Sequence, residues 1–326
     1  MQRKVRIAVV GAGVFGRHHL RILKQSPAAD LIAVVDPDPE RAQAAAVEFG
    51  CEAAASIDAL YGQIEAAVVA APTSAHAEIG VPLLERGIDV LIEKPIASNH
   101  DDAARLVDAA ARHERILQVG HLERFNPAVT AMHQILTVPL FFEIHRLSLF
   151  SQRSLDVDVV LDLMIHDLEI ILAMVGEKPE EVRAAGIRIL SEKVDIANVR
   201  LAFANGCIAN LTASRVSTER VRKLRLFQPS QYISLDYEKQ QAASFTISPA
   251  KHIGFENLKI EKAEPLRLEV EDFLECVASR RRPRVSGQDG LRALDLALDI
   301  LAKIEEHAAL VERQLQVGPQ ATPVRF

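Results

Sequence analysis

A glycine-rich turn between two short hydrophobic runs constrains the fold of this 326-residue chain more than any other feature. The runs are residues 5–10 and 31–35, and Gly11, Gly13 and Gly16 open the helix-like segment between them. Short apolar runs bounded by glycine are typical of strands that are buried on both faces of a parallel sheet. The chain is therefore predicted to begin with a strand–helix–strand unit.

The three glycines have the spacing of a dinucleotide-binding turn. Gly11 would make the tight turn, Gly13 would let a pyrophosphate approach the backbone, and Gly16 would let the helix pack closely. The start of that helix can hold an anion through its unpaired N–H groups and its dipole. Asp36 follows Gly16 by twenty residues, where a carboxylate meets the ribose hydroxyls of NAD. These features predict an NAD site, and the alternative is a βαβ unit that binds no nucleotide.

Composition excludes several functional classes. A net charge of −6 argues against a protein that binds nucleic acid by broad electrostatic attraction. No apolar run has membrane-spanning length, and the first residues lead into a strand instead of a signal-peptide core. The three scattered cysteines have neither a metal-binding spacing nor the pattern of a disulfide framework: Cys51, Cys207 and Cys276. We expect a cytoplasmic protein with no membrane insertion and no metal site.

The chain divides into two parts by its pattern of hydrophobic runs. Through about residue 120, runs such as 66–71 and 89–92 alternate with helix-like segments. This alternation predicts an α/β domain with a doubly wound parallel sheet over residues 1–120. The whole chain is too long for one typical domain, so residues 121–326 are expected to form a second domain.

The second part begins with a helix and continues with strands. Residues 158–175 are helical in pattern, and strand-like runs follow one another from residue 182. Asn205-Gly206 joins two of these runs and predicts a two-residue hairpin turn. Antiparallel strands that follow a helix predict an α+β domain.

Glu93-Lys94-Pro95 directly follows the run at residues 89–92, so it is expected at the carboxyl edge of the parallel sheet, where open α/β folds bind ligands. A lysine there can donate hydrogen bonds to a substrate oxygen and stabilise alkoxide charge. Pro95 restricts the backbone of Lys94 and can aim its side chain. The alternative is a solvated lysine beside a turn proline.

Asp162 and His166 are four residues apart, so they share one face of a helix. Their neighbours are mostly apolar, which predicts a partly buried site. A histidine is the natural acceptor of a hydroxyl proton, and a nearby carboxylate can orient it. Two alternatives stay open: the pair could serve helix packing, and Asp158 or Asp167 could be the relevant acid.

Residues 120–127 lie where the first part of the chain meets the second. A glycine after a strand, here Gly120, lets a flat nicotinamide ring approach the backbone. Arg124 and Asn126 could hold polar or anionic parts of a substrate. The alternative is an interdomain linker with a helix that starts at Pro127.

Together these motifs make the chain resemble the glucose–fructose oxidoreductase, inositol dehydrogenase and MocA family along nearly its whole length. The motifs that carry the resemblance are Gly11–Gly16, Ala71-Pro72-Thr73 with His76, Glu93-Lys94-Pro95, and Asp162 with His166. The resemblance implies a Rossmann domain followed by a domain with an open, mainly antiparallel sheet. It also implies a homo-oligomer, a dimer or tetramer, that forms through that sheet, and a catalytic set of Lys94, Asp162 and His166.

The resemblance implies an NAD cofactor, since no arginine stands just after Asp36 to hold the 2′-phosphate of NADP. The implied cofactor contacts are Gly11, Gly13, Val14, Phe15, Gly16, Asp36, Ala71, Pro72, Thr73, His76, Glu93, Lys94 and Gly120. Thr73 departs from the family, which often has asparagine there. The implied substrate contacts are Arg124, Asn126 and His166.

Residues 119–127 and 158–167 resemble family members of the 3-dehydrogenase type, which act on UDP-linked N-acetylhexosamines such as UDP-N-acetylglucosamine. Such members supply a 3-keto sugar for amination in lipid A precursors. The resemblance therefore implies NAD-dependent oxidation of a sugar ring hydroxyl at C3. The alternatives are a dehydrogenase of free sugars or inositol-type polyols and an NAD-binding sensor without turnover. The intact set of Lys94, Asp162 and His166 argues against the sensor.

Overall fold

The structure is a computed structural model that describes residues 3–150 and 157–317. It separates into two compact units. The first comprises the chain up to residue 131 together with residues 259–295, and the second comprises residues 132–258 and the chain from residue 296. The predicted functional domains, residues 1–120 and 121–326, stay a prediction. The compact units differ from them because residues 259–295 pack with the first part of the chain.

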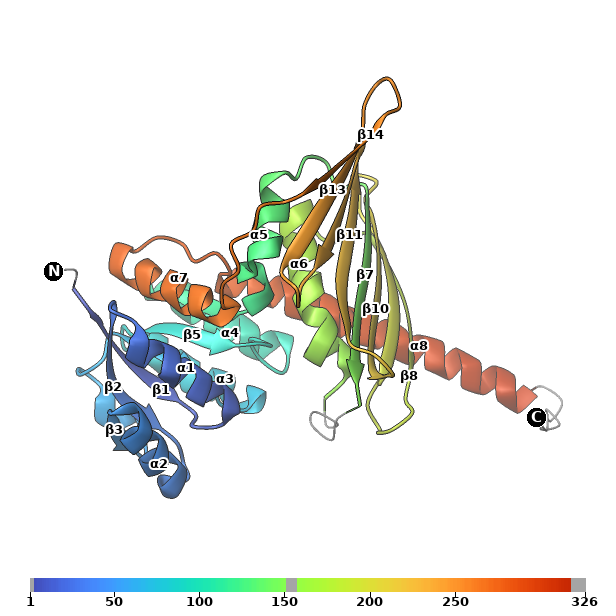
Figure 1. Ribbon diagram of the computed structural model, residues 1–326. Coiled ribbons are helices and arrows are strands. Elements are labelled where there is room, and N and C mark those ends of the chain that lie inside the picture. Colours follow the sequence, from blue (N-terminus) through green and yellow to red (C-terminus); the bar gives the residue numbers. More distant parts are fainter. Residues whose placement is uncertain (1–2, 151–156, 318–326) are drawn as a thin grey trace. The chain divides into compact units, whose positions relative to one another are not determined.

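The first unit is built on a parallel sheet of six strands (Figure 1). Its strands are β1 (Val5–Val10), β2 (Ala29–Val35), β3 (Glu52–Ala54), β4 (Ala66–Val69), β5 (Asp89–Glu93) and β6 (Leu117–Gly120). They are ordered β3-β2-β1-β4-β5-β6, and every neighbouring pair is parallel. The predicted doubly wound sheet is confirmed. Strand order reverses between β1 and β4, the switch point at which such sheets bind ligands.

Helices connect these strands, and local capping explains where several begin. They are α1 (Val14–Gln25), α2 (Pro39–Phe49), α3 (His76–Glu85) and α4 (His100–Arg112), with short 3₁₀ turns η1 (Ile57–Leu60), η2 (Thr73–Ala75) and η3 (Leu122–Phe125). The Asp38 side chain accepts hydrogen bonds from the backbone N–H groups of Glu40 and Arg41 at the start of α2. Asn99 accepts one from Asp102 at the start of α4. Each cap satisfies amides that have no partner within the helix.

The helix α7 (Pro265–Ser279) joins the first unit although it lies far along the chain. Its Val270 and Phe273 are fully buried in the same hydrophobic cluster as Ile7 of β1 and Leu20 of α1. Burying each such side chain contributes about 1.5–3 kcal/mol. Val119 of β6 also donates a backbone hydrogen bond to Val285, at 3.0 Å. Apolar packing and backbone pairing therefore assign residues 259–295 to this unit.

The second unit is built on an eight-stranded sheet of order β14-β13-β12-β11-β7-β10-β9-β8. Its strands are β7 (Phe141–Leu149), β8 (Glu181–Ile187), β9 (Ile196–Ala202), β10 (Ile208–Ser217), β11 (Val221–Gln228), β12 (Gln231–Asp236), β13 (Gln241–Ile247) and β14 (Ile253–Asn257). Only the β7–β10 pair is parallel among the described strands of this sheet. The expected open, mainly antiparallel sheet is confirmed.

A helical segment lies along one face of this sheet (Figure 1). The single helix expected over residues 158–175 is two pieces: a π-helical turn, η4 (Val160–Met164), followed by α6 (Ile165–Val175). Gly176 has φ +85° and ends α6 in a left-handed cap. π-Helical turns are rare inside helices and occur often at functional sites. The remaining helices are α5 (Pro127–Gln134) and α8 (Gly287–Val317).

Among the described residues, no helix combines the length and the apolar composition that crossing a membrane requires.

The hairpin at Asn205-Gly206 has a three-residue loop, so the expected two-residue turn is wrong. Phe203 donates a backbone hydrogen bond to Cys207 at 3.0 Å, and Gly206 donates one to Phe203 at 2.9 Å. Gly206 has φ +85°, the left-handed region that glycine adopts at no cost. This is the three-residue hairpin in which a left-handed residue follows a type I turn.

Replacing Gly206 with alanine should lower the free energy of unfolding by about 1 kcal/mol. A Cβ at this position would meet no atom within 4 Å, so the cost comes from the backbone conformation alone. Urea unfolding of wild type and Gly206→Ala measures it. Gly206→Asn is the control, because asparagine tolerates the left-handed region and should lose less. Equal stability of all three proteins would contradict the loop conformation.

Candidate functional site

The glycine turn after β1 has the geometry that a bound dinucleotide needs. Gly11 has φ +102°, and its N–H donates to the carbonyl of Val35 at 2.7 Å. A Cβ on Gly16 would lie only 1.8 Å from the Gly11 oxygen, so α1 approaches the turn more closely than any other residue allows. A Cβ on Gly13 would meet nothing within 4 Å, which leaves open space beside its backbone. Gly11 thus makes the tight turn, Gly16 allows α1 to approach that turn closely, and Gly13 leaves open space beside the backbone.

The first turn of α1 is free to bind an anion. Gly13 is its N-cap, no side chain caps it, and its first turn holds no acidic residue. Val14 and Phe15, the first two helical residues, are 57% and 51% exposed. Backbone N–H groups at such a helix end favour a phosphate group. This donor set and the space beside Gly13 fit the diphosphate of NAD.

Asp36, directly after β2, is buried and holds two loops together. Its Oδ2 accepts a hydrogen bond from Ala12 N–H at 2.8 Å, and its Oδ1 accepts one from Asp38 N–H at 3.0 Å. Arg41 Nε lies 3.6 Å from Asp36 Oδ1. The sequence has no arginine directly after Asp36, but the first turn of α2 brings Arg41, five residues on, back to the carboxylate.

The loop after β4 is tied to the loop after β5 by a buried histidine. His76 Nδ1 lies 3.0 Å from the Pro95 carbonyl oxygen, and His76 Nε2 lies 3.0 Å from that of Ala71. Burial lowers the pKa of His76, and these carbonyl contacts oppose the shift. Thr73 and Pro72 lie in the loop that the histidine holds. Cofactor contacts by Ala71, Pro72, Thr73 and His76 stay predictions.

Two cations gather near the carboxyl ends of β5 and β6. Lys94 follows β5, and Arg124 lies in η3, just after β6. Burial, then the charges of Lys94 and Arg124, lowers the pKa of His121 to about 3. The His121 imidazole is therefore neutral at pH 7 and adds no charge of its own. The side chains of Lys94 and Arg124 can pair with the anionic or developing negative oxygens of a ligand.

Gly120 is required by its neighbour Glu93. A Cβ at residue 120 would lie 3.0 Å from Glu93 Oε2 and 3.2 Å from Glu93 Cα. Glu93 Oε1 in turn lies 2.7 Å from Nε2 of His19, on α1. The glycine therefore makes room for a buried carboxylate, and its expected approach to a nicotinamide ring stays a prediction.

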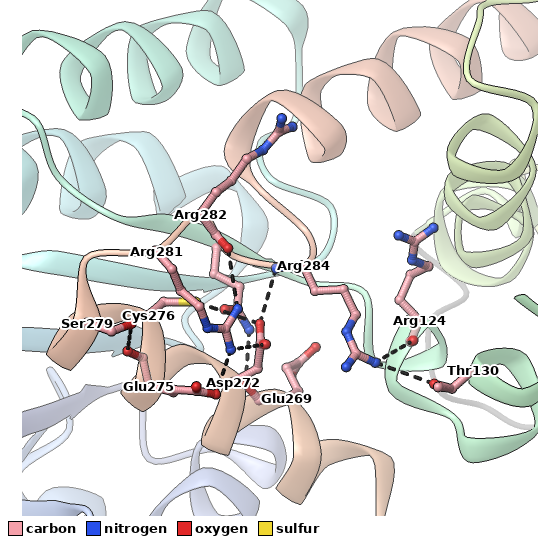
Figure 2. Close-up of polar contacts among 11 residues, drawn as sticks. Arg124, Thr130, Glu269, Asp272, Glu275, Cys276, Ser279, Arg281, Arg282 and Arg284 are labelled. Carbon is pink, nitrogen blue, oxygen red and sulfur yellow. Dashed lines mark hydrogen bonds and ion pairs between the residues drawn. The ribbon is translucent and has the colours of Figure 1, made fainter. Parts of the chain in front are cut away.

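Asn126 caps α5, the helix that the linker interpretation expected to start at Pro127. Its Oδ1 accepts a hydrogen bond from Ala128 N–H at 3.0 Å at the start of α5, and its Nδ2 donates to Glu123 Oε2 at 3.2 Å. Arg124 offers its carbonyl oxygen to Arg284 at 3.5 Å (Figure 2). Substrate contacts by Asn126 and Arg124 stay predictions.

Asp158, Asp162 and Asp167 were the candidates for the acid that acts with His166. Asp158 and Asp167 make hydrogen bonds that hold other parts of the second unit. Asp167 accepts two hydrogen bonds from Arg146, at 2.7 and 2.8 Å, and one from the Tyr237 hydroxyl at 3.2 Å. Asp158 Oδ1 accepts one from Val194 N–H at 2.8 Å. Both carboxylates are thus committed to holding the fold together. Asp162 lies on the π-helical turn and the buried His166 lies at the start of α6, and the pairing of these two residues stays a prediction.

Lys94 belongs to the first unit, whereas Asp162 and His166 belong to the second. Their action as one catalytic set therefore stays a prediction.

Two family models match the chain. The model of an oxidoreductase family with an NAD-binding Rossmann fold matches residues 5–121, and that of the GFO/IDH/MocA C-terminal domain matches residues 136–228. The chain belongs to the GFO/IDH/MocA oxidoreductase family. The expected family, its NAD cofactor and its oxidoreductase class are confirmed.

Relatives in the GFO/IDH/MocA family match nearly the whole chain. UDP-N-acetylglucosamine 3-dehydrogenase of Acidithiobacillus ferrooxidans is 34% identical over 307 residues, covering 92% of this chain and 97% of the relative. A solved structure of that protein has a TM-score of 0.88, covering 93% of this chain and 98% of that one. Inositol 2-dehydrogenase of Rhizobium meliloti is 26% identical over 338 residues, covering 96% and 99%.

Two alanine substitutions in the glycine turn separate folding from cofactor binding. Gly16→Ala should destabilise the protein, because its Cβ would overlap the Gly11 carbonyl. Gly13→Ala should keep wild-type stability yet weaken NAD binding at least about tenfold, or 1.4 kcal/mol, by filling the open space. Thermal unfolding and NAD titration calorimetry measure the two effects. NAD affinity unchanged by Gly13→Ala would place the diphosphate elsewhere.

Proposed function

We propose that this protein uses NAD to oxidise the C3 hydroxyl of a UDP-linked N-acetylhexosamine. The observation that carries the substrate class is 34% identity, over 92% of the chain, to a UDP-N-acetylglucosamine 3-dehydrogenase. The site supports the reaction class through an open anion-binding turn and a lysine on the same edge of one sheet. The oxidised product is a 3-keto sugar, the type of compound that an amination step would consume.

The first unit would hold the cofactor. The N–H groups of Val14 and Phe15 would bind the diphosphate beside Gly13, and Asp36 would accept hydrogen bonds from the ribose hydroxyls. NAD, when bound, supplies the hydride acceptor. Asp36 keeps its carboxylate fixed for this role through the N–H groups of Ala12 and Asp38.

The chain's own side chains would move the proton and stabilise the oxygen. A ring nitrogen of His166 would accept the hydroxyl proton, and Asp162 would orient that ring. The Lys94 ammonium would donate a hydrogen bond to the substrate oxygen and stabilise it as negative charge develops. Arg124 would hold the diphosphate of the nucleotide sugar, since guanidinium groups pair well with phosphate oxygens.

A free polyol such as inositol is the second candidate substrate. It is supported by 26% identity to an inositol 2-dehydrogenase over 96% of this chain. A polyol carries no diphosphate, so it would leave Arg124 without the role proposed above.

A substrate panel tests the proposal. NADH absorbance is followed with UDP-N-acetylglucosamine, UDP-N-acetylgalactosamine, inositol and glucose. Turnover of the UDP sugars and not of the free polyols is expected. Lys94→Ala should lower kcat about 10²- to 10³-fold and weaken NAD binding by much less, because it removes one donor to the developing oxyanion. Inositol as the preferred substrate would favour the second candidate, and full activity of Lys94→Ala would remove the lysine from the mechanism.

The cytoplasm is the proposed location. Cys51, Cys207 and Cys276 are free thiols in the structure, which suits a reducing compartment.

A homo-oligomer that forms through the second unit's sheet is also proposed. Five aromatic side chains form a row across β7, β11, β12, β13 and β14, each opposite the next in register: Phe141, Phe227, Tyr232, Phe245 and Phe255. Neighbouring ring centroids lie 4.7–5.8 Å apart. Phe227 and Phe255 are 37% and 60% exposed. A row of this kind is typical of a protein–protein interface.

Replacing Phe245 with aspartate should dissociate the oligomer, because it puts a charge in the middle of the aromatic row. Light scattering coupled to size-exclusion chromatography measures the mass of each protein. Val47→Asp is the control, since Val47 is 74% exposed on α2, in the other unit. A monomeric wild type, or a Phe245→Asp variant of unchanged mass, would contradict an interface on this row.

A further inference from the structure

Glu269, on α7, is a fully buried acid that the proposed chemistry does not use. Its side chain is 0% exposed, and neither carboxylate oxygen has a hydrogen-bond partner among the described residues. Its neighbour Asp272, by contrast, accepts hydrogen bonds from Arg281 at 2.7 Å and from the Arg284 backbone N–H at 3.2 Å (Figure 2). An ionised carboxylate left buried in this way costs several kcal/mol.

Two strands and a helix bring polar groups close to Glu269. Ligand atoms of Glu269, Glu93 on β5 and His19 on α1 all lie within 4.8 Å of one another. From β6, the Gln118 side-chain amide donates to the Glu269 carbonyl oxygen at 3.0 Å, so it does not reach the carboxylate. On α7 itself the nearby titratable group is Asp272, which is also an acid. The surroundings therefore add negative charge instead of neutralising it.

The histidine of this cluster, His19, has a hydrogen-bond partner at one of its two ring nitrogens. Its Nε2 lies 2.7 Å from Glu93 Oε1, and because a carboxylate only accepts, Nε2 carries a proton. Its Nδ1 is buried and has no partner within the described part of the chain. His19 therefore reaches Glu93, whereas neither oxygen of Glu269 has a hydrogen bond to it.

Two buried acids this close cannot both ionise without a cation, so the pair retains a proton. Glu93 has a hydrogen bond from His19, whereas neither oxygen of Glu269 has a partner among the described residues. Burial, then the charges of Glu93 and Asp272, raises the pKa of Glu269 well above its ordinary value. The proton belongs on Glu269.

We propose that Glu269 is held as a neutral carboxylic acid at pH 7 and is a positioning residue for Glu93 and the adjacent Lys94. A second negative charge at residue 269 would repel the Glu93 carboxylate from its place between His19 and Gly120. The cluster thus joins α1, which carries the glycine turn, to the loop that carries Lys94. The link to Lys94 rests on the proposed function, whereas the retained proton does not.

The retained proton predicts how stability depends on pH. In the unfolded chain Glu269 has its ordinary pKa of 4.5 and releases its proton around that pH. The folded protein keeps the proton at higher pH, because its pKa is raised. The stabilisation is fully present below the unfolded pKa and is lost as the pH rises toward the raised folded value.

Glu269→Gln tests this, because an amide has the shape of the protonated acid and does not titrate. The midpoint of thermal unfolding of wild type should fall relative to that of Glu269→Gln as the pH rises from about 5 to about 9. Glu271→Gln, at an exposed position of the same helix, is the matched control and should track wild type. A constant difference between wild type and Glu269→Gln across this range would overturn the proposal.

Infrared spectroscopy of wild type detects the proton directly and does not depend on how well a variant folds. A protonated carboxyl C=O stretch is expected at pH 7, and it should vanish in Glu269→Gln. An absent band in wild type would overturn the proposal. Stabilisation of wild type by zinc ions that Glu269→Gln lacks would also overturn it, because a metal ion would then balance the two acids.

Kinetics test the positioning role separately. Glu269→Ala should lower kcat about ten- to a hundredfold with the KM for NAD within about twofold, and Glu269→Gln should restore kcat. An equal loss of kcat in Glu269→Ala and Glu269→Gln would show that the shape of the protonated acid, which glutamine keeps, does not position Lys94. Wild type without any turnover would count against the proposed function, while the stability and infrared results would still decide the retained proton.

Discussion

The first unit depends on one close backbone contact, the approach of α1 to the Gly11 carbonyl at Gly16. A single Cβ at residue 16 would lie 1.8 Å from that oxygen. The contact fixes where α1 begins, so its unpaired N–H groups point at the end of β1, at the switch point of the sheet. The same helix carries His19 into the core, where it meets Glu93. Anion binding and the buried acid cluster therefore share one structural origin.

Charge is arranged in two layers at the carboxyl edge of this sheet. Lys94 and Arg124 are cations at this edge, and the neutral His121 lies near both. Behind them, Glu93 and Glu269 are buried with one histidine. Because charges in a buried layer interact strongly, the protonation of the acids affects the groups in front of them. The sheet edge thus combines a binding surface with a buried support.

In the second unit, hydrogen bonds hold the chain on both sides of the π-helical turn that carries the proposed acid. Asp158 is fixed by Val194 before the turn, and Asp167 by Arg146 and Tyr237 after it, near the start of α6. Asp162 lies on that turn, where the helix departs from α geometry. A side chain on such a turn can project differently from one on an α-helix, so the spacing of Asp162 and His166 has a structural context that the α-helical pattern did not include.

The sequence by itself determined the features that local periodicity and glycine chemistry encode. These are the parallel sheet, the roles of Gly11 and Gly16 in the turn, the helix start at Pro127 and the mainly antiparallel second sheet. Contacts between distant segments were decided only by the tertiary structure: Arg41 beside Asp36, α7 in the core of the first unit, and Glu269 beside Glu93. No local pattern joins residues 93 and 269, because their meeting results from the packing of a late helix on an early sheet. The reason is physical: neighbours in sequence set the backbone conformation, but burial sets the partners and the charge of each side chain.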